Sequence, residues 1–289
     1  CYNMENYVIL GGFKMSTVRR ISKSANQKGG YLKPSQFETT IIDDGIQLMD
    51  MKFETIHYFN MGMVVEYLTR LEMGVSPNDV FTIAKEGILN AFKHGFEDAI
   101  NYMDLISNIK KGLDDQSIIN ACTLTTFDTW CRNFFSAMKA ASTYSLYSAK
   151  QEIIYPNKIY LDTNTIKNIR TMVQRSINFW KIYGPIIETG FTFKKEAFTN
   201  TVTDGEGDFL TKDTIWDYKV SKNKLTTQQT LQLLMYWIIG QHDGSPKYKN
   251  IKKLGIFNPR LNIVYTLNVS QIPDEIIEAV EKDVICYEK

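Results

Sequence analysis

The sequence predicts a mixed α/β fold in which helices flank a β-sheet, and three observations lead to this prediction. Residues 76–185 are helical in character almost throughout. Residues 186–289 contain short runs rich in Thr, Phe, Val and Ile that are typical of strands, interrupted by one long helical segment. An earlier helix at 54–73 is separated from them by the helical block. We therefore predict one composite domain: an N-terminal segment with the first core helix (1–75), a helical insertion or lobe (76–185) and a core that contains the sheet (186–289).

The first fifty residues are predicted to be irregular, apart from a short strand at 7–10. Within them, residues 16–33 contain five basic residues, Arg19 and Arg20 among them, and no acidic residue. We interpret this segment as an exposed loop. The alternative is an arm that contacts phosphates, because lysine and arginine displace counterions from a nucleic-acid backbone.

The helical block is divided by short breaks into four predicted helices, at 77–93, 97–111, 116–147 and 163–183. Its aromatic side chains are predicted to form a core, and a surface on which single-stranded bases stack is the alternative. These aromatic residues include Trp130, Phe134, Phe135, Tyr144 and Tyr147.

The strands of the C-terminal core are predicted to begin near Ile186. Besides the hairpin described next, the predicted elements are strands at 190–193, 197–202, 252–257 and 261–267, an amphipathic helix at 273–282 and a last strand at 284–287.

One predicted hairpin places charged side chains on a single face of the sheet. If residues 215–220 form a strand, Asp217 and Lys219 point to one face and the bulky residues between them point to the other. A two-residue turn before this strand would place Asp208, on the preceding strand, directly across from Asp217. Opposed side chains in such a pair have Cβ atoms about 4.5–5.5 Å apart. Two carboxylates at that separation repel each other, which becomes an advantage if a divalent cation lies between them.

A long helix follows the hairpin and is predicted to end at Gly240. Thr226 and Gln229 have the spacing of a capping box at its start. Gln232 and Tyr236 are four residues apart and therefore lie on one helical face. A hairpin with two acids and a lysine, followed by a helix with this pair, occurs by chance less often than any of these features alone.

Composition narrows the class of protein. With 44% hydrophobic and 12% aromatic residues, the chain of 289 residues can bury a sizeable core. Its formal net charge is only +1, so any contact with phosphates must come from local patches. The four cysteines have neither zinc-ribbon nor disulfide-scaffold spacing, and we expect reduced thiols in a cytoplasmic protein. No apolar run approaches the roughly 18 residues of a membrane span, and the N-terminus does not have the pattern of a signal peptide.

The hairpin and the helix after it resemble the PD-(D/E)xK nuclease superfamily, and within it the RecB-like branch that includes CRISPR-associated and phage exonucleases. The matching segments are 205–210 (GEGDFL), 217–219 (DYK) and 232–236 (QLLMY). That branch also has an upstream helix in which a glycine is followed four residues later by a histidine or glutamate, and Gly62 and Glu66 match this pattern. The resemblance covers the core and leaves the helical block unexplained.

The resemblance implies a restriction-endonuclease-like core with a mixed central sheet. It also implies a nuclease that hydrolyses phosphodiester bonds with Mg²⁺ or Mn²⁺, with DNA as the expected partner, such as a phage or mobile-element exonuclease of recombination or repair. Asp208 and Asp217 would be the principal ligands of the ion, joined by the backbone carbonyl of Tyr218 and by Glu66, directly or through water. Lys219 would position the attacking water or stabilise charge in the transition state.

The resemblance also implies roles for residues around this centre. Gln232 would steady Lys219 or the phosphate, and Tyr236 would support the helix or touch the backbone. The candidate substrate contacts are Tyr236, Arg260, Arg19 and Arg20. Some RecB-like proteins carry a four-cysteine iron–sulfur cluster with three cysteines grouped near the C-terminus. This chain has only Cys286 there, so no cluster is expected.

Two other classes of protein fit the same sequence. The first is a nuclease-fold protein with a weak or silent site that binds nucleic acid or a partner protein in host–virus conflict. The second is a helical interaction module in which the acidic hairpin is incidental, and it predicts that Asp208 and Asp217 point apart.

Overall fold

The computed structural model describes residues 17–25, 30–132 and 161–288, which form two compact units. The sheet unit contains residues 17–25, 30–44 and 179–288, and the helical unit contains 45–132 and 161–178. The boundary between them falls within the helix α8 (Thr163–Tyr183). This division places the helix that carries Glu66 in the helical unit. The strand predicted at 7–10 and residues 133–147 of the helix predicted at 116–147 lie outside the described residues.

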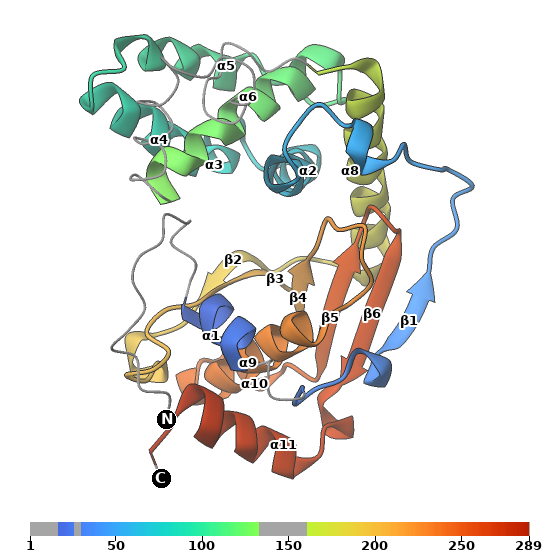
Figure 1. Ribbon diagram of the computed structural model, residues 1–289, viewed down its shortest axis with the longest axis vertical. Coiled ribbons are helices and arrows are strands. Elements are labelled where there is room, and N and C mark those ends of the chain that lie inside the picture. The colour runs from blue at the N-terminus through green and yellow to red at the C-terminus, as the bar shows by residue number, and fades with distance from the viewer. Residues whose placement is uncertain (1–16, 26–29, 133–160, 289) are drawn as a thin grey trace. The chain divides into compact units, whose positions relative to one another are not determined.

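The sheet unit is built on a mixed sheet, for which the described residues supply six strands in the order β1-β6-β5-β4-β3-β2 (Figure 1). The strands are β1 (Glu38–Ile41), β2 (Glu188–Thr192), β3 (Glu206–Leu210), β4 (Thr214–Tyr218), β5 (Lys253–Asn258) and β6 (Ile263–Asn268). The neighbours β4 and β5 are parallel, and all other neighbours are antiparallel. A parallel pair needs a crossover connection, which here contains the helix α9 (Thr227–Asp243). The prediction of a mixed sheet flanked by helices is confirmed.

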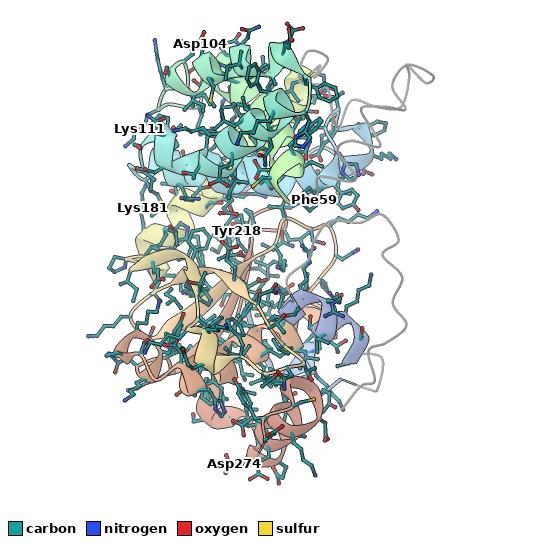
Figure 2. All side chains as sticks on the ribbon, turned by 90° about the vertical axis from the view of Figure 1, so that its left-hand side faces the viewer. Phe59, Asp104, Lys111, Lys181, Tyr218 and Asp274 are labelled. Carbon is teal, nitrogen blue, oxygen red and sulfur yellow. The ribbon has the colours of Figure 1, made fainter. Side chains whose placement is uncertain are left out.

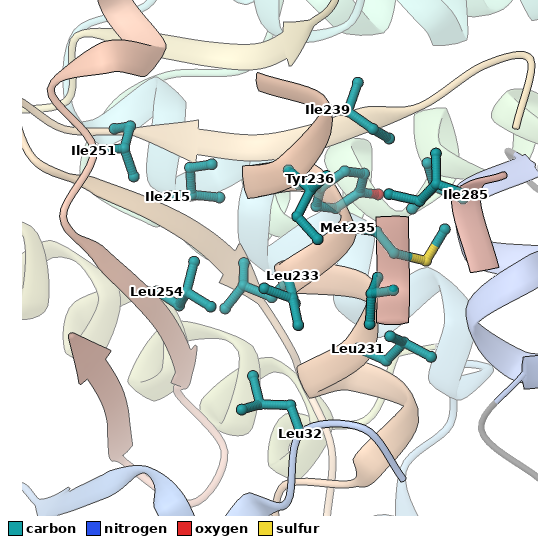
Figure 3. Close-up of a cluster of buried hydrophobic side chains, with 14 of the residues drawn as sticks. Leu32, Ile215, Leu231, Leu233, Met235, Tyr236, Ile239, Ile251, Leu254 and Ile285 are labelled. Carbon is teal, nitrogen blue, oxygen red and sulfur yellow. The ribbon is translucent and has the colours of Figure 1, made fainter. Parts of the chain in front are cut away.

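One face of this sheet packs on α9, and Figure 3 shows part of the resulting core. Strand residues Ile215 and Leu254 meet Leu231 and Leu233 of the helix there, and all four are fully buried. The other elements that contribute to this face are α1 (Thr17–Ala25), α10 (Pro246–Lys249), α11 (Asp274–Ala279) and the π-helical turn η8 (Val280–Ile285). Because α9 is buried on nearly all sides, its position relative to β4 is tightly constrained.

The opposite face of the sheet packs on the last turn of α8 through aromatic rings. Phe179 stacks on Phe257 of β5 with ring centroids 4.1 Å apart, and it meets Trp216 of β4 edge to face at 4.9 Å. Trp180 packs on Phe209 of β3 at 4.9 Å. Trp216 therefore faces α8 while Ile215 faces α9, as the alternation predicted for this strand requires.

The helical unit contains seven further helical elements besides α8 among its described residues. They are the 3₁₀ helix η3 (Met51–Phe53), α2 (Tyr58–Glu72), α3 (Pro77–Val80), α4 (Thr82–Lys93), a 3₁₀-to-α pair η4 (Glu97–Tyr102) and α5 (Met103–Ser107), and α6 (Asp115–Arg132). Trp130 is buried, which confirms the prediction that it belongs to a core; Phe134, Phe135, Tyr144 and Tyr147 lie outside the described residues. Residues Thr165 and Asn168 of α8 hold the segment before α2 by hydrogen bonds to Thr55 and Met49.

Two elements near the N-terminus were not predicted. Residues 17–25, predicted to be a loop, form α1, because Val18, Ile21 and Ala25 share one buried face with helical spacing. The cap of this helix comes from Asp204, far away in the chain, whose Oδ1 accepts from Thr17 N at 2.5 Å. Strand β1 lies in a region predicted to be irregular; all its residues are exposed, so it has no alternating pattern that would reveal it.

Two predicted strands are absent from the described residues, and both predictions are wrong. At 197–202 the hydroxyl of Thr199 accepts hydrogen bonds from the backbone of Thr201 and Val202, which closes a turn in place of a strand. At 284–287 the chain continues from α11 into η8. Val280 and Val284 are four apart and both buried, a spacing that suits a helical turn.

Helix α9 continues three residues beyond Gly240, where it was predicted to end. Gly240 is inside the helix, where a Cβ would come within 2.9 Å of the Tyr248 ring, so the glycine allows α10 to pack closely. The helix ends at Asp243, and Gly244 adopts the left-handed conformation (φ 70°) that glycine favours after a helix. The predicted capping box of Thr226 and Gln229 is confirmed.

Candidate active site

The hairpin β3–β4 brings the two predicted acids opposite each other. Phe209 pairs with Trp216 and Leu210 with Ile215, and Thr211 N donates to Thr214 O across a two-residue turn. Continued by one residue, this register places Asp208 across from Asp217. Residues directly across from each other on paired strands point to the same face, so this register does not support the alternative in which Asp208 and Asp217 point apart.

Asp217 is the buried member of the pair and is neutralised by Lys219. The Asp217 side chain is 4% exposed and that of Lys219 is 26% exposed. Lys219 Nζ lies 2.8 Å from Oδ1 and 2.7 Å from Oδ2 of Asp217, so the ammonium contacts both oxygens. A buried carboxylate normally needs such a partner. The prediction that these two side chains share one face is confirmed.

Asp208 contacts the end of β4 directly. Its Oδ2 accepts a hydrogen bond of 2.6 Å from the backbone N–H of Tyr218, the last residue of the strand, which is labelled in Figure 2. The bond fixes the Asp208 carboxylate beside the peptide group that joins Asp217 to Tyr218. Two carboxylates and one ammonium therefore meet at the end of β4, and their formal charges sum to −1.

Gln232 and Tyr236 form the helical side of the site. Gln232 Nε2 lies 2.9 Å from the Tyr236 hydroxyl, which itself donates to the carbonyl of Glu206 in β3 at 2.7 Å. Burial and the negative charge of Asp217 raise the pKa of Tyr236, and Asp208 adds to this. Both acids therefore act electrostatically on the hydroxyl, and they favour its protonated form, which is the form that donates a hydrogen bond.

The predicted substrate contacts fall in different places. Arg19 is exposed on α1, and its positive charge opposes the rise in the pKa of Tyr236. Arg20 is half-buried on the same helix. Arg260 is largely buried in the turn after β5. Tyr236 is 2% exposed and committed to the Glu206 carbonyl, a position that suits support of the helix more than contact with a substrate.

Glu66 belongs to the helical unit. It is half-buried on α2, with a carboxylate oxygen 3.9 Å from the guanidinium of Arg70 one turn later. A Cβ at Gly62 would have no neighbour within 4 Å, so packing does not require the glycine. The assignment of Glu66 as a further metal ligand stays a prediction.

Asn258 is a residue of this region that the sequence reasoning missed as part of the site. It is the last residue of β5 and is buried, and its side-chain amide bonds both to the segment after β4 and to the turn that carries Arg260. The only signal in the sequence is its place before Pro259, where an asparagine is read as an ordinary turn residue.

The donors at the end of β4 suit a hard divalent cation. Carboxylate and carbonyl oxygens are the ligands that Mg²⁺ and Mn²⁺ prefer, and Mg²⁺ usually takes one or two carboxylates and keeps several waters. Among the described residues, no group of three or more His, Cys, Asp or Glu side chains is placed to hold an ion. A cation bound by Asp208 and Asp217 would therefore complete its shell with the Tyr218 carbonyl, water or substrate oxygens.

Comparison with known proteins does not assign this chain to a family. A scan against family models, a search of curated proteins and a search of solved structures each gave no match. Within the described parts of the chain, no helix combines the length and the apolar character needed to span a bilayer.

Proposed function

We propose that the chain is a divalent-metal-dependent nuclease that hydrolyses phosphodiester bonds in DNA. The observation that carries the proposal is the meeting of Asp208, Asp217 and Lys219 at the end of β4, beside Gln232 and Tyr236 of α9. This is the set of residues on which the resemblance to RecB-like nucleases rests. The mixed sheet with its β4–α9–β5 crossover is compatible with a restriction-endonuclease-like core.

In this proposal Asp208 and Asp217 would hold Mg²⁺ or Mn²⁺ together with the Tyr218 carbonyl, and Glu66 would be a further ligand. When bound, the ion supplies neutralisation of phosphate charge and a lowered pKa for coordinated water. The Lys219 ammonium orients the attacking water or stabilises the charge that develops on the phosphorus oxygens. Because Lys219 contacts both oxygens of Asp217, a phosphate that enters the site competes with the carboxylate for the ammonium.

Gln232 and Tyr236 orient the site in this proposal. The single hydroxyl proton of Tyr236 goes to the Glu206 carbonyl, so the hydroxyl accepts from Gln232 Nε2. This polarity leaves Gln232 Oε1 as an acceptor for Lys219 or for a water molecule. The basic side chains of α1, Arg19 and Arg20, and Arg260 of the β5–β6 turn would contact the phosphates of the DNA.

A second candidate is a nuclease-fold protein that binds nucleic acid or a partner protein without cleaving. The observation that favours it is the ion pair itself, since the Lys219 ammonium already neutralises the charge of Asp217. The two candidates differ in the role of Lys219. In the nuclease it acts on the attacking water or the phosphate, and in the binding protein it only neutralises Asp217. We propose the cytoplasm as the place of action for either, in line with Cys122, Cys131 and Cys286, none of which forms a disulfide among the described residues.

Cleavage of end-labelled and circular DNA, and of RNA, tests the proposal. We expect products from DNA in Mg²⁺ or Mn²⁺ and none after chelation of divalent ions. Linear substrate loss with intact circles indicates attack from ends. Cleavage that survives complete chelation contradicts the metal-dependent mechanism. The absence of any cleavage, with nucleic acid still bound, favours the second candidate.

A further inference from the structure

The parallel strands β4 and β5 end side by side, and each is followed by a segment with a basic residue of the proposed site. Tyr218 pairs with Phe257 at the end of the ladder, and Lys219 N donates to Phe257 O at 3.0 Å. Beyond this bond the two chains separate. The segment 219–225, which contains Lys219, leads to α9, and the turn 259–262, which contains Arg260, leads to β6.

One side chain connects these two segments. Asn258 Nδ2 donates to Ser221 O at 2.8 Å, and Asn258 Oδ1 accepts from Arg260 N at 3.0 Å and from Leu261 N at 3.3 Å. A longer contact of 3.5 Å joins Ser221 N to the same Oδ1. The residue is 3% exposed, so these bonds form away from competing water.

We propose that Asn258 is a positioning residue: it fixes the segment 219–225 against the turn 259–262, so that Lys219 and Arg260 keep one spacing. The effect of Asn258 on catalysis rests on the proposed function, whereas its role in joining the two segments does not. Two basic groups on separate loops contact one phosphate backbone productively only if their separation is fixed, because misplacement of a catalytic group is costly in rate. The amide is suited to this role because it offers a donor and an acceptor in one rigid plane.

The simpler interpretation is that Asn258 only closes its own turn. Asparagine side chains commonly accept from backbone N–H groups two residues later, and the bond from Arg260 N has this pattern. The acceptor half contacts Ser221 only through the long 3.5 Å contact with its N–H. The two interpretations therefore differ mainly in the donor half of the amide, which makes the 2.8 Å bond to Ser221 O and contributes nothing to the turn 259–262. Replacing that half alone therefore separates them.

The Asn258→Asp variant distinguishes the two interpretations. It keeps the acceptor for Arg260 N and Leu261 N, and it replaces the hydrogen bond to Ser221 O by a repulsive contact between two oxygens. Asn258→Ala removes both halves. Asn262→Asp is the matched control: Asn262 lies in the same turn and is also buried, and its Nδ2 donates to the carbonyl of Ile42 at 2.6 Å, in a segment that carries none of the proposed site residues. Amide hydrogen exchange, measured residue by residue by NMR on the full chain, reports on both segments without requiring enzymatic activity.

We expect Asn258→Asp to speed exchange at Lys219 and Asn223 by about tenfold, while Arg260 and Leu261 stay protected. Asn258→Ala should speed exchange in both segments, and Asn262→Asp should leave 219–225 as in the wild type. Unchanged exchange at Lys219 and Asn223 in the Asn258→Asp variant would overturn the proposal. Asn258 would then only close its own turn. If the wild type also cleaves DNA, the Asn258→Asp variant should lower kcat about tenfold or more with little change in metal affinity. A wild type that does not cleave contradicts the proposed function, and the exchange result still decides the role of Asn258.

Discussion

Lys219 and Asp217 form a two-pronged ion pair at the end of β4, with the ammonium 2.8 and 2.7 Å from the two carboxylate oxygens. The acid is almost completely buried and the lysine is partly exposed, so the pair presents its basic side to the solvent. Asp208 lies across the hairpin and is bonded to the peptide group between them. Under the proposed function, this arrangement of charges would hold a cation and a phosphate together.

Replacement of Asp217 by Asn should abolish cleavage. The amide keeps the size of the side chain but removes the charge that would hold the ion, and the loss should reach at least about 10³-fold in kcat/KM. The measurement is the single-turnover cleavage rate of labelled DNA in Mg²⁺. Asp213→Asn, at the turn of the same hairpin, is the matched control and should retain activity. Equal losses in both variants would instead indicate damage to the hairpin.

Replacement of Lys219 by Met should lower kcat by about 10²–10³-fold, the usual effect of removing one group that stabilises developing charge. Lys222→Met, which replaces an exposed lysine on the same loop, should leave kcat unchanged and weaken DNA binding modestly. Thermal unfolding of both proteins tests whether loss of the ion pair affects the fold. If the Lys219→Met variant is fully active, the ion pair has a structural role and no catalytic one.

Replacement of Tyr236 by Phe should both destabilise the protein and impair the site. It leaves the Glu206 carbonyl without its donor, which costs about 1–3 kcal/mol of unfolding free energy, and it frees the Gln232 amide to rotate. Tyr248→Phe is the matched control, because this hydroxyl donates to the Thr192 carbonyl at 2.6 Å. Urea unfolding should give similar losses for the two variants, and only the Tyr236→Phe variant should lose activity. If both variants cleave DNA equally well, the Tyr236 hydroxyl has no role in the site.

Acidification should loosen the start of α2, the helix that carries Glu66. His57 caps this helix by accepting from Phe59 N at 3.3 Å, and burial lowers its pKa below the ordinary value of 6.5. A lowered folded-state pKa means that this contribution to stability is complete above about pH 6.5 and is lost as the pH falls through the folded-state pKa. His57→Asn keeps an acceptor that does not titrate, so hydrogen exchange at the start of α2 should increase on acidification in the wild type and not in the variant. The same pH response in both proteins would contradict this assignment.

Much of the sheet unit was predictable from local patterns. The alternation around Trp216, the two-residue turn before Thr214 and the capping box at Thr226 are each determined by neighbours in the sequence, and all three are confirmed. The predictions that failed concern elements that depend on partners far away in the sequence. Helix α1 takes its cap from Asp204, and β1 has no buried face of its own, so neither shows in its own segment.

The candidate site divides in the same way. Asp217, Lys219 and Asp208 could be placed together because they lie on one hairpin, and Gln232 and Tyr236 because they share one helical face. The effect of Arg19 on the pKa of Tyr236 and the connection made by Asn258 could not be predicted, because both arise from packing between elements far apart in sequence.

Binding of Mn²⁺, measured by electron paramagnetic resonance on the wild type, Asp217→Asn and Asp213→Asn, tests the central claim most directly. The account predicts that the wild type and the Asp213→Asn variant bind the ion alike. It also predicts that the Asp217→Asn variant binds the ion at least about tenfold more weakly, because a charged oxygen ligand has been lost. The same Mn²⁺ affinity in all three proteins, or none in the wild type, would contradict it.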